Sequence, residues 1–462
     1  MHKELVFGSG WIPAELPDDA FLVPPGVSVP LAPAPDLAQA VDDALDRPLD
    51  TPPLRELARG ARRVTVAFDD PTVLCYAPVW SVAIPRILGA LGEAGVPGDR
   101  VTLACANGLH RKFTNDELAS ILGEQVVAEF APDGRLVCND AEDAEGMVHL
   151  GDLEDGAEVE VNRLVTDSDL TVYLNASTVR GFSGGWKSVC VGLSSYRSIR
   201  WHHTPDTMSM TTEKNRMHET LDRMGAVVEG ALGADRFFKI DTILSNPLQV
   251  HRLVGGSVGA TRREVLEVMR ASQPPRRNLL PEKVDVVLYG VPDWSPYAAF
   301  SFLNPLLTLL STGLGYLGGM VEALGKPGCT VIMATPVADR WDEVHHPSYR
   351  EVWERVLPET RDPFVVRERF EPEFAARADY VDRYRWGFGF HPVHAIMALY
   401  PLKRLRHAGR VLVAGAEDPE LVRHAGFEPA SSVEEALRMA AETHGNHPSV
   451  AVVENPPAFN RT

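Results

Sequence analysis

A glycine-rich turn that ends in a lysine is the strongest candidate for chemistry in this chain. The turn, residues 181–188 (GFSGGWKS), directly follows the strand-like segment LTVYLNAS. Backbone amides in such a turn can surround an anionic group, and a lysine at its end can reach the same group. We therefore expect a small molecule with an anionic part to bind here, held in part by Lys187.

This turn has two other interpretations. Its spacing resembles the P-loop pattern G-x-x-x-x-G-K-[ST], in which the lysine reaches the terminal phosphates of a nucleotide. Trp186 replaces the last glycine of that pattern, and an indole side chain there requires a different turn. A P-loop NTPase and a plain turn with a surface lysine remain the alternatives.

Two further polar groups follow strand-like segments. His110 lies in ANGLHRK (residues 106–112), and Asp69, Asp70 and Thr72 lie in FDDPT. Ligands of open α/β sheets bind at the carboxyl ends of the strands, and an imidazole there can exchange a proton near neutral pH. The other interpretations are a histidine that bonds only to backbone, and an Asx-type turn before a proline.

The remaining histidines of interest form two pairs. His202 and His203 are adjacent in WHHT, and His391 and His394 lie in FHPVH. Imidazoles bind zinc, copper, iron and nickel, so each pair could hold a metal. For His391 and His394 we favour the alternative that they begin a helix.

The elements around these residues indicate the α/β class. Short β-branched segments alternate with helical patterns, which is typical of βα units with largely parallel sheets. The expected strands are residues 63–68, 101–106, 170–175, 240–245, 284–289, 330–334, 411–414 and 450–453. Helices are expected at 37–45, 79–94 and 262–269, and capping boxes at Thr114 and Ser432 begin two more.

The proline-rich, charged segment 272–283 (SQPPRRNLLPEK) is the best domain boundary. It divides the chain into an α/β domain of residues 1–275, which carries the glycine-rich turn and His110, and a second α/β domain of residues 284–462. We expect the second domain to close over the substrate, with the active site in the cleft between the two. Its last helix and strand are expected to return to the first domain.

Composition excludes several classes of protein. The 462 residues are 45% hydrophobic, as in globular proteins, and a formal charge of -18 repels nucleic acid. Five single cysteines and the absence of a secretion signal favour the cytoplasm. Residues 297–321 are uncharged and long enough to cross a membrane, but Pro305 and several glycines favour a buried helix pair. The acidic segment 140–160 is expected to be a solvated loop and strand edge rather than a metal site.

In their order along the chain, these residues resemble the nickel-pincer lactate racemase family. That family's Asp-x-Thr is matched by Asp70 to Thr72, its Ala-Thr-Gly-x-His-Arg by residues 106–111, and its Gly-Phe-Ser-Gly-Gly-x-Lys by residues 181–187. Its metal-binding histidine falls at His203, with His202 as the adjacent competitor. The opening VFGSG and the segment SVEEALRMAAE also resemble the family's ends.

The resemblance implies a cofactor and an activity. The cofactor is the nickel-pincer nucleotide, a pyridinium-3,5-bisthiocarboxylic acid mononucleotide that holds nickel through one carbon and two sulfurs. The resemblance also implies that Lys187 is the covalent tether, that His203 is the fourth nickel ligand and that His110 is the acid/base. The other cofactor-binding residues it implies are Asp70, Thr72, Ser183, Gly184 and Gly185. The implied reaction inverts a secondary-alcohol carbon by transient hydride transfer, and the enzymes that make the cofactor are implied partners.

The chain departs from the family at the substrate-binding positions. The second acid/base histidine is Ser177, the carboxylate-binding arginine is Val73, and Tyr-Gln-Ala-x-Lys reads Tyr297 to Ser301 (YAAFS). A buried carboxylate without a cationic partner costs several kcal/mol, so we expect a hydroxyl-bearing substrate other than lactate. The candidate substrate residues are Arg111, Arg180, Tyr297, Ser177 and His391, with Lys112 as a further candidate anchor.

Two other functions remain open. The same cofactor could serve a redox or elimination step without racemisation, because one base and two anchors are missing. A protein that binds the cofactor without catalysis is the other alternative, although the retained His110 argues against it. A homo-oligomer is compatible with either function.

Overall fold

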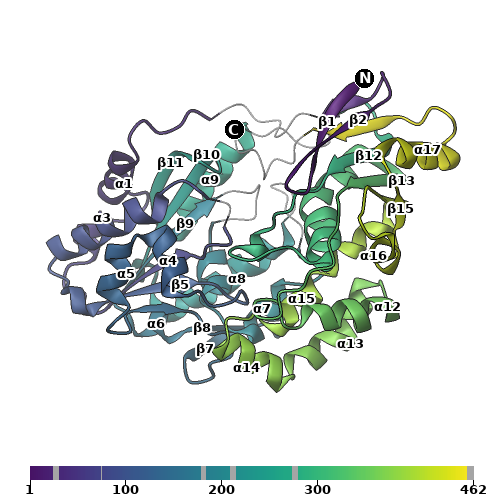
Figure 1. Cartoon of the computed structure of the whole chain (residues 1–462). Helices are drawn as coiled ribbons and strands as arrows, with labels where there is room; N and C mark the ends of the chain where they lie inside the picture. The colour runs from purple at the N-terminus through teal and green to yellow at the C-terminus, as the bar shows by residue number, and fades with distance from the viewer. Residues whose placement is uncertain (24–30, 74, 178–183, 209–214, 273–278, 455–462) are drawn as a thin grey trace. The chain divides into compact units, whose positions relative to one another are not determined.

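The computed structural model describes the chain except for residues 24–30, 74, 178–183, 209–214, 273–278 and 455–462 (Figure 1). It divides into two compact units. We call residues 30–272 with 384–388 the N-terminal unit, and residues 1–29, 273–383 and 389–462 the C-terminal unit. Each unit holds a six-stranded, mainly parallel sheet flanked by helices, so the expected α/β class is confirmed.

The division differs from the expected domains at two places. Residues 1–29 group with the C-terminal unit because β3 (Phe21–Val23) pairs in parallel with β16 (Val450–Val453). The last strand therefore stays in its own unit. The segment that joins the N-terminal unit is instead 384–388, because the Tyr384 hydroxyl donates to the carbonyl of Gly108 and accepts from the backbone N–H of Ala141.

The sheet of the N-terminal unit has the order β11-β10-β9-β4-β5-β6, and β11 is its antiparallel strand. Its strands are β4 (Val64–Asp69), β5 (Val101–Ala106), β6 (Leu136–Cys138), β9 (Leu170–Ser177), β10 (Phe237–Asn246) and β11 (Gln249–Gly256). Its helices are α1 (Leu37–Asp46), α2 (Leu54–Leu57), α3 (Val79–Glu93), α4 (Asn115–Leu122), α5 (Glu124–Phe130), α6 (Arg163–Asp167), α7 (Tyr196–His202), α8 (Arg216–Leu232) and α9 (Val258–Ser272). All residues of β9 are buried, as expected for a strand covered on both faces.

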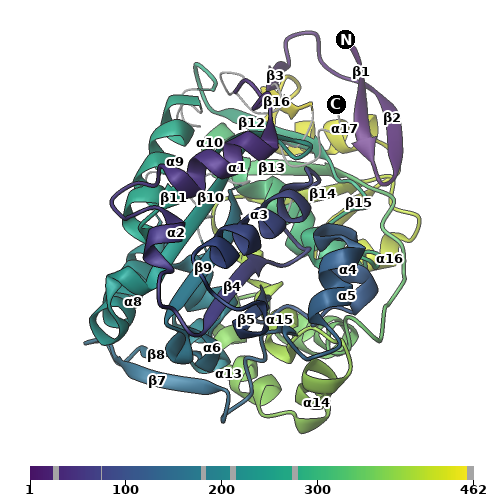
Figure 2. The same ribbon diagram turned by 90° about the vertical axis from the view of Figure 1, so that its left-hand side faces the viewer.

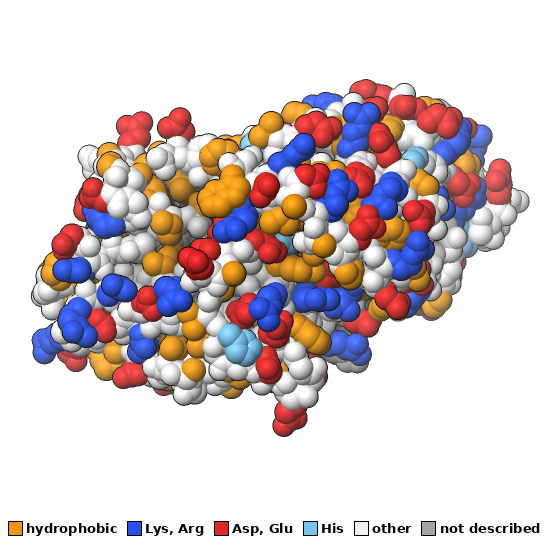
Figure 3. Space-filling model, turned by 90° about the horizontal axis from the view of Figure 1, so that it is seen from below, with side chains coloured by type: hydrophobic (Ala, Val, Ile, Leu, Met, Phe, Trp, Pro, Cys, Tyr) orange, Lys and Arg blue, Asp and Glu red, His pale blue; other side chains and the backbone are white. Residues whose placement is uncertain are grey.

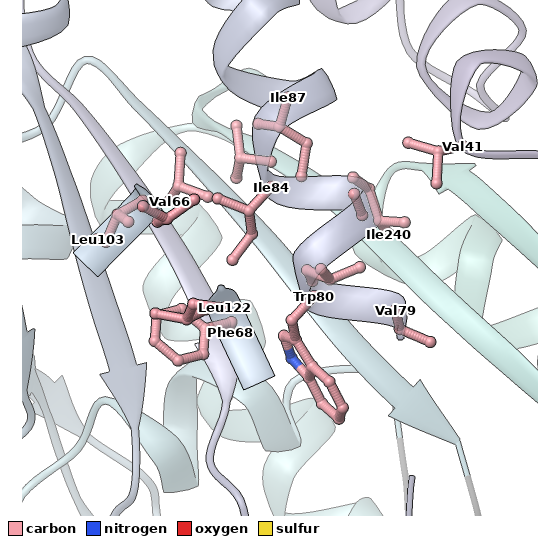
Figure 4. Close-up of a cluster of buried hydrophobic side chains, with 14 of the residues drawn as sticks. Val41, Val66, Phe68, Val79, Trp80, Ile84, Ile87, Leu103, Leu122 and Ile240 are labelled. Atoms are coloured by element: carbon pink, nitrogen blue, oxygen red, sulfur yellow. The ribbon is translucent and has the colours of Figure 1, made fainter. Parts of the chain in front are cut away.

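One face of this sheet is covered by α1 and α3 (Figure 2). Val66 and Phe68 of β4 pack there against Ile84 and Ile87 of α3 (Figure 4). Burial of each such side chain stabilises the fold by about 1.5–3 kcal/mol. The face is thus a rigid support for the strand ends that carry Asp70 and His110.

The opposite face carries α8 and the hairpin of β7 (Met147–Asp152) and β8 (Glu158–Asn162). Trp186 is buried here, edge-on to Phe237 at a centroid distance of 5.1 Å. A Cβ on Gly225 of α8 would lie 2.1 Å from the indole, so α8 makes room for this residue. Trp186, which stands where the P-loop pattern has a glycine, thus packs in the core and holds the end of the glycine-rich turn against it.

The acidic segment forms the β7–β8 hairpin and its flanking loops, as expected. Within the part of the chain that the structure describes, no cluster of histidine, cysteine and carboxylate side chains has the arrangement of a metal site. Acidic and basic side chains are interspersed on the face shown in Figure 3.

The sheet of the C-terminal unit has the order β15-β14-β13-β12-β16-β3, and all its pairs are parallel. Its other strands are β12 (Val284–Gly290), β13 (Gly325–Ala334), β14 (Arg410–Ala414) and β15 (Glu428–Ala430), beside a separate hairpin of β1 (His2–Phe7) and β2 (Gly10–Glu15). Its helices are α10 (Val321–Leu324), α11 (Tyr349–Glu351), α12 (Leu357–Glu359), α13 (Pro363–Ala375), α14 (Ala378–Trp386), α15 (Pro392–Met397), α16 (Pro419–His424) and α17 (Val433–His444). Of these, α14 ends in the N-terminal unit.

The apolar segment before β13 forms one continuous helical run rather than the expected pair of helices. π-helical turns at Leu307–Tyr316 continue through a 3-10 turn at Leu317–Met320 into α10, so the glycines do not break the run. Among the described residues, the stretch Leu307–Leu324 is long and apolar enough to cross a membrane. Since 67% of it is buried inside the structure, it has the burial of a core helix.

The two predicted helix starts differ in their caps. At Thr114 the full capping box is present, with Glu117 accepting from the Thr114 backbone. At Ser432 the side chain accepts from the Glu435 N–H, but the Glu435 carboxylate accepts from Ser431 instead. The second capping box is therefore only half formed.

Candidate active site

The loops after β4 and β5 bring Asp70, Thr72 and His110 together. β4 and β5 are adjacent and parallel, so their carboxyl ends meet at one edge of the sheet. The Asp70 Oδ2 atom lies 2.8 Å from Nδ1 of His110, and Thr72 Oγ1 lies 3.1 Å from the same nitrogen. Three residues that the sequence singled out separately thus form one hydrogen-bonded group.

Asp70 is held ionised in this group. Burial by itself would raise the pKa of its carboxyl, but the charge and hydrogen bond of His110 and the bonds from Thr72 outweigh it, and the pKa is lowered. The carboxylate accepts a hydrogen bond, so Nδ1 of His110 carries the proton and Nε2 is the ring atom that exchanges one. The His110 side chain is 27% exposed, whereas Asp70 is buried.

The His110 loop is rigid because its backbone is tied to neighbouring segments. The Asn107 side chain donates to the carbonyls of His110 and Asn139, both at 3.1 Å. Gly108 has a φ of +53°, and a Cβ there would lie 2.9 Å from the Val191 carbonyl oxygen. The motif glycine is therefore required both by its backbone conformation and by a close approach.

A matching close approach occurs at Gly192, in the π-helical turn Ser188–Gly192 that follows Lys187. A Cβ on Gly192 would lie 2.6 Å from the Cβ of Ala106, and its carbonyl accepts from Gly108 N–H at 3.0 Å. The turn after Lys187 and the loop of His110 are thus packed backbone to backbone.

The described part of the glycine-rich turn begins at Gly184. Gly184 and Gly185 have φ values of +81° and +58°, and Cβ atoms there would lie 3.2 Å from Asp241 Oδ1 and 3.3 Å from Arg262 Cδ. The Gly184 N–H donates to Asn175 Oδ1 at 3.2 Å. Gly181, Phe182 and the predicted cofactor residue Ser183 lie outside the described residues.

Lys187 is half-buried at the end of this turn. Burial lowers the pKa of its amine, the carboxylates of Asp69 and Asp70 oppose this effect, and Arg262 adds to it. The net lowering increases the share of the neutral, nucleophilic amine. Lys187 therefore shares one electrostatic environment with the Asp70 and His110 pair.

Two buried charged residues near the turn, Lys239 and Asp241, were not predicted from the sequence. Lys239 of β10 donates to Asn175 Oδ1 at 3.0 Å, and its amine lies 3.6 Å from Asp241 Oδ1. On β4, Asp69 accepts from the Tyr173 hydroxyl at 3.0 Å, and burial raises the pKa of its carboxyl despite Lys187 and Lys239. Charged residues two apart in the otherwise apolar segment FFKIDTIL were the available signal.

The Asp241 carboxylate is 0% exposed and ion-paired with Lys239, yet neither of its oxygens has a hydrogen-bond donor in the described structure. In the described structure these oxygens therefore keep capacity to accept further hydrogen bonds. Together with the glycine cradle and the amine of Lys187, this arrangement fits an anchored, hydrogen-bonding cofactor.

His202 and His203 lie at the end of α7. Nε2 of His202 is 3.2 Å from the Cys190 carbonyl oxygen, and its Nδ1 is 2.9 Å from Nδ1 of His203. Burial lowers the pKa of His202 to about 3. The pKa of His203 is also far below its usual value, first through burial and then through His202, Lys187 and His110. Both rings are therefore neutral, which is the form that binds metals.

The candidate substrate residues of the N-terminal unit have structural partners. The Arg111 guanidinium is 1% exposed and forms two hydrogen bonds with the Glu117 carboxylate, at 2.6 and 3.0 Å. Lys112 donates to Asp140 Oδ2 at 3.0 Å. Ser177 is buried at the end of β9 and accepts from Asn175, while Arg180 lies outside the described residues.

In the C-terminal unit, His391 is the N-cap of α15, and its Nδ1 accepts from the Val393 N–H at 3.3 Å. The favoured alternative, a helix-start histidine, is therefore what the structure shows. Tyr297 packs against the ring of His394 at 4.5 Å, and its carbonyl accepts from His346 Nε2. Ser301, which replaces the family's lysine, donates to Asp342.

Comparison with known proteins shows similarity to lactate racemases. Residues 7–217 match the family model described as the lactate racemase N-terminal domain. Lactate racemase from Lactiplantibacillus plantarum is 28% identical over 230 residues, which span 49% of this chain and about half, 52%, of that relative. Lactate racemase from Thermoanaerobacterium thermosaccharolyticum is 23% identical over 433 residues, which span 89% of this chain and 88% of the relative.

Solved structures agree on the fold. The lactate racemase apoprotein from T. thermosaccharolyticum aligns with a TM-score of 0.70 and 20% identity, over 98% of each chain. A protein from Thermotoga maritima aligns with a TM-score of 0.53 and 12% identity, over 93% of this chain and 98% of that chain. At these identities the two alignments show that the fold is shared. Residues 7–217 thus match a lactate racemase N-terminal domain, and the chain is similar to lactate racemases over most of its length.

Proposed function

We propose that this protein is a nickel-pincer-nucleotide-dependent racemase or epimerase that inverts a secondary-alcohol carbon. The observation that carries the proposal is that Lys187 and His110 both lie close enough to His203 to lower its pKa, and that Lys187 follows a two-glycine cradle. These are the residues that match the family's tether, metal ligand and acid/base.

Each group of residues has a part in this proposal. Lys187 would hold the cofactor covalently, His203 would bind nickel, and Gly184, Gly185 and the Asp70–Thr72 loop would surround the nucleotide. When bound, such a cofactor would supply an acceptor, and then a donor, for the hydride of the carbinol carbon. Soft sulfur donors with one imidazole suit nickel.

The chain's own contribution to the reaction is orientation and proton transfer. His110 would take the hydroxyl proton at Nε2 and give it back, because Asp70 holds the other ring nitrogen in its protonated form. Asp70 also stabilises the imidazolium that forms. The tied backbone at Asn107 and Gly108 keeps the ring in place through both proton transfers.

The substrate in this proposal is a hydroxyl compound other than lactate. Val73 packs against the apolar core instead of offering a guanidinium, and the charge of Arg111 is neutralised by Glu117. A carboxylate in this site would have to be bound without either residue, at a desolvation cost of several kcal/mol. Larger or less polar secondary alcohols are favoured.

A non-racemising redox or elimination reaction on the same cofactor is the second candidate. Ser177 favours it, because inversion needs proton transfer on both faces and this position carries a hydroxyl instead of an imidazole. We also place the reaction in the cytoplasm, with the cofactor-making enzymes as partners and no nucleic acid or membrane.

The test is co-expression with the cofactor-making enzymes. Intact mass should show a covalent adduct on wild-type protein and none on Lys187→Ala, and nickel should accompany the adduct. Chiral chromatography on a panel of secondary alcohols should then show inversion. An adduct without turnover would favour a binding protein, net oxidation or elimination would favour the second candidate, and absence of the adduct would refute the proposal. Magnesium-dependent nucleotide binding without an adduct would favour the P-loop alternative.

A further inference from the structure

The pair of adjacent histidines contains a directional hydrogen-bond chain. The Cys190 carbonyl lies in the π-helical turn that follows Lys187, where the last carbonyls have no partner inside the helix. A carbonyl oxygen can only accept, so the hydrogen in its 3.2 Å contact with Nε2 of His202 is on the imidazole.

That assignment determines the rest of the chain. The His202 ring is 0% exposed, so desolvation favours its neutral form, which has one N–H. With the hydrogen on Nε2, Nδ1 of His202 is an acceptor. The contact of 2.9 Å to His203 then requires the hydrogen on Nδ1 of His203.

We infer that His202 is a positioning residue that fixes His203 in the Nδ1–H tautomer, so that Nε2 of His203 is the atom that binds the metal. The metal part of this inference rests on the proposed function; the tautomer part does not. Histidine ligands of metals generally donate their second ring N–H to a fixed acceptor, which sets ring orientation and basicity.

The two histidines therefore have different roles. His202 is excluded as a ligand, because Nε2 is bonded to Cys190 and Nδ1 to His203. The chain also links His203 to the turn that begins directly after Lys187, so the metal ligand and the tether are positioned by one backbone segment.

The first test is nitrogen-15 NMR of histidine-labelled, full-length apoprotein. Two-bond proton–nitrogen correlations separate the two neutral tautomers, and His203→Gln assigns the signals. We expect the Nδ1–H tautomer for His203 and the Nε2–H tautomer for His202. The opposite tautomer at either ring would overturn the inference, whatever the cofactor.

The second test uses two variants. In His202→Gln the amide can donate to Cys190 and accept from His203, so the His203 tautomer should be kept. In His202→Leu neither bond is possible, and the His203 signals should shift toward Nε2–H. An unchanged tautomer in a folded His202→Leu protein would refute the role of His202. If that variant does not fold, loss of the tautomer in His202→Gln would refute it equally.

The third test measures nickel retention in protein carrying the Lys187 adduct. His202→Leu should lose nickel to a chelator about 10–100-fold faster than wild type, while His202→Gln and the exposed control His149→Leu should not. Equal loss from all four proteins would refute the metal part of the inference. No adduct in wild type would refute the proposed function and leave the NMR result standing.

Discussion

Nδ1 of His110 donates to the Asp70 carboxylate across 2.8 Å, although the two residues are 40 positions apart. The Asp70 carboxylate is buried, whereas the His110 imidazole is 27% exposed, so the ring covers its hydrogen-bond acceptor from solvent. This relationship determines which nitrogen of His110 is available for proton transfer.

Replacement of His110 by alanine should separate cofactor attachment from turnover. Attachment depends on Lys187, whereas proton transfer depends on His110, so turnover should fall roughly 100-fold or more while the adduct is kept. Intact mass and the racemisation assay measure the two properties on one sample. Equal loss of adduct and turnover would contradict the assigned role.

Gly192→Ala should destabilise the protein because the new Cβ would meet Ala106 at 2.6 Å, where backbone atoms cannot move easily. Overpacking of this kind costs about 1–3 kcal/mol. The matched control is Gly89→Ala in α3, where nothing lies within 4 Å and the change should stabilise by about 0.5–1 kcal/mol. Thermal unfolding should show midpoint shifts of opposite sign; a fall in both would argue against the packing explanation.

Glu117→Gln should lower the free energy of unfolding by an amount that depends on pH. Burial by itself would raise the pKa of Glu117, but the hydrogen bonds from Arg111 and Thr114 outweigh it, and the pKa is lowered. A lowered folded-state pKa adds stability above the unfolded value of about 4.3, and this stability is lost as pH falls through the folded value.

The variant should therefore be less stable than wild type by about 1–3 kcal/mol at neutral pH, because the buried Arg111 loses its charged partner. The difference should shrink as pH is lowered below about 4. Denaturant unfolding of both proteins at several pH values measures it. A difference that stays constant down to acid pH would show that the charge of Glu117 is irrelevant.

His391 should behave as a helix cap. His391→Ala removes the acceptor for the Val393 N–H and should cost about 0.5–2 kcal/mol, while His391→Asn should recover most of the loss. Turnover by folded His391→Asn should equal that of wild type. A large loss of turnover in a stable His391→Asn protein would support the prediction that His391 is a substrate residue.

Several features followed directly from the sequence. The alternation of apolar strands and helices predicted two parallel sheets, and the Thr114 capping box predicted the start of α4. The meeting of Asp70 and His110 was also predictable, because the carboxyl ends of adjacent parallel strands lie at one edge. These features depend on local patterns or on a general rule of topology.

Other features were decided only by the tertiary structure. Arg111 and His391 have side chains that could bind a substrate. In the structure, Arg111 forms an ion pair with Glu117, and His391 caps the start of α15. The buried ion pair of Lys239 and Asp241 lies next to the glycine-rich turn. Residues 1–29 belong to the C-terminal unit. The reason is the same in each case. A charged side chain could form an ion pair, and an edge strand could form hydrogen bonds, with many different partners in the chain. Which partner is adjacent depends on how distant segments pack in the folded protein.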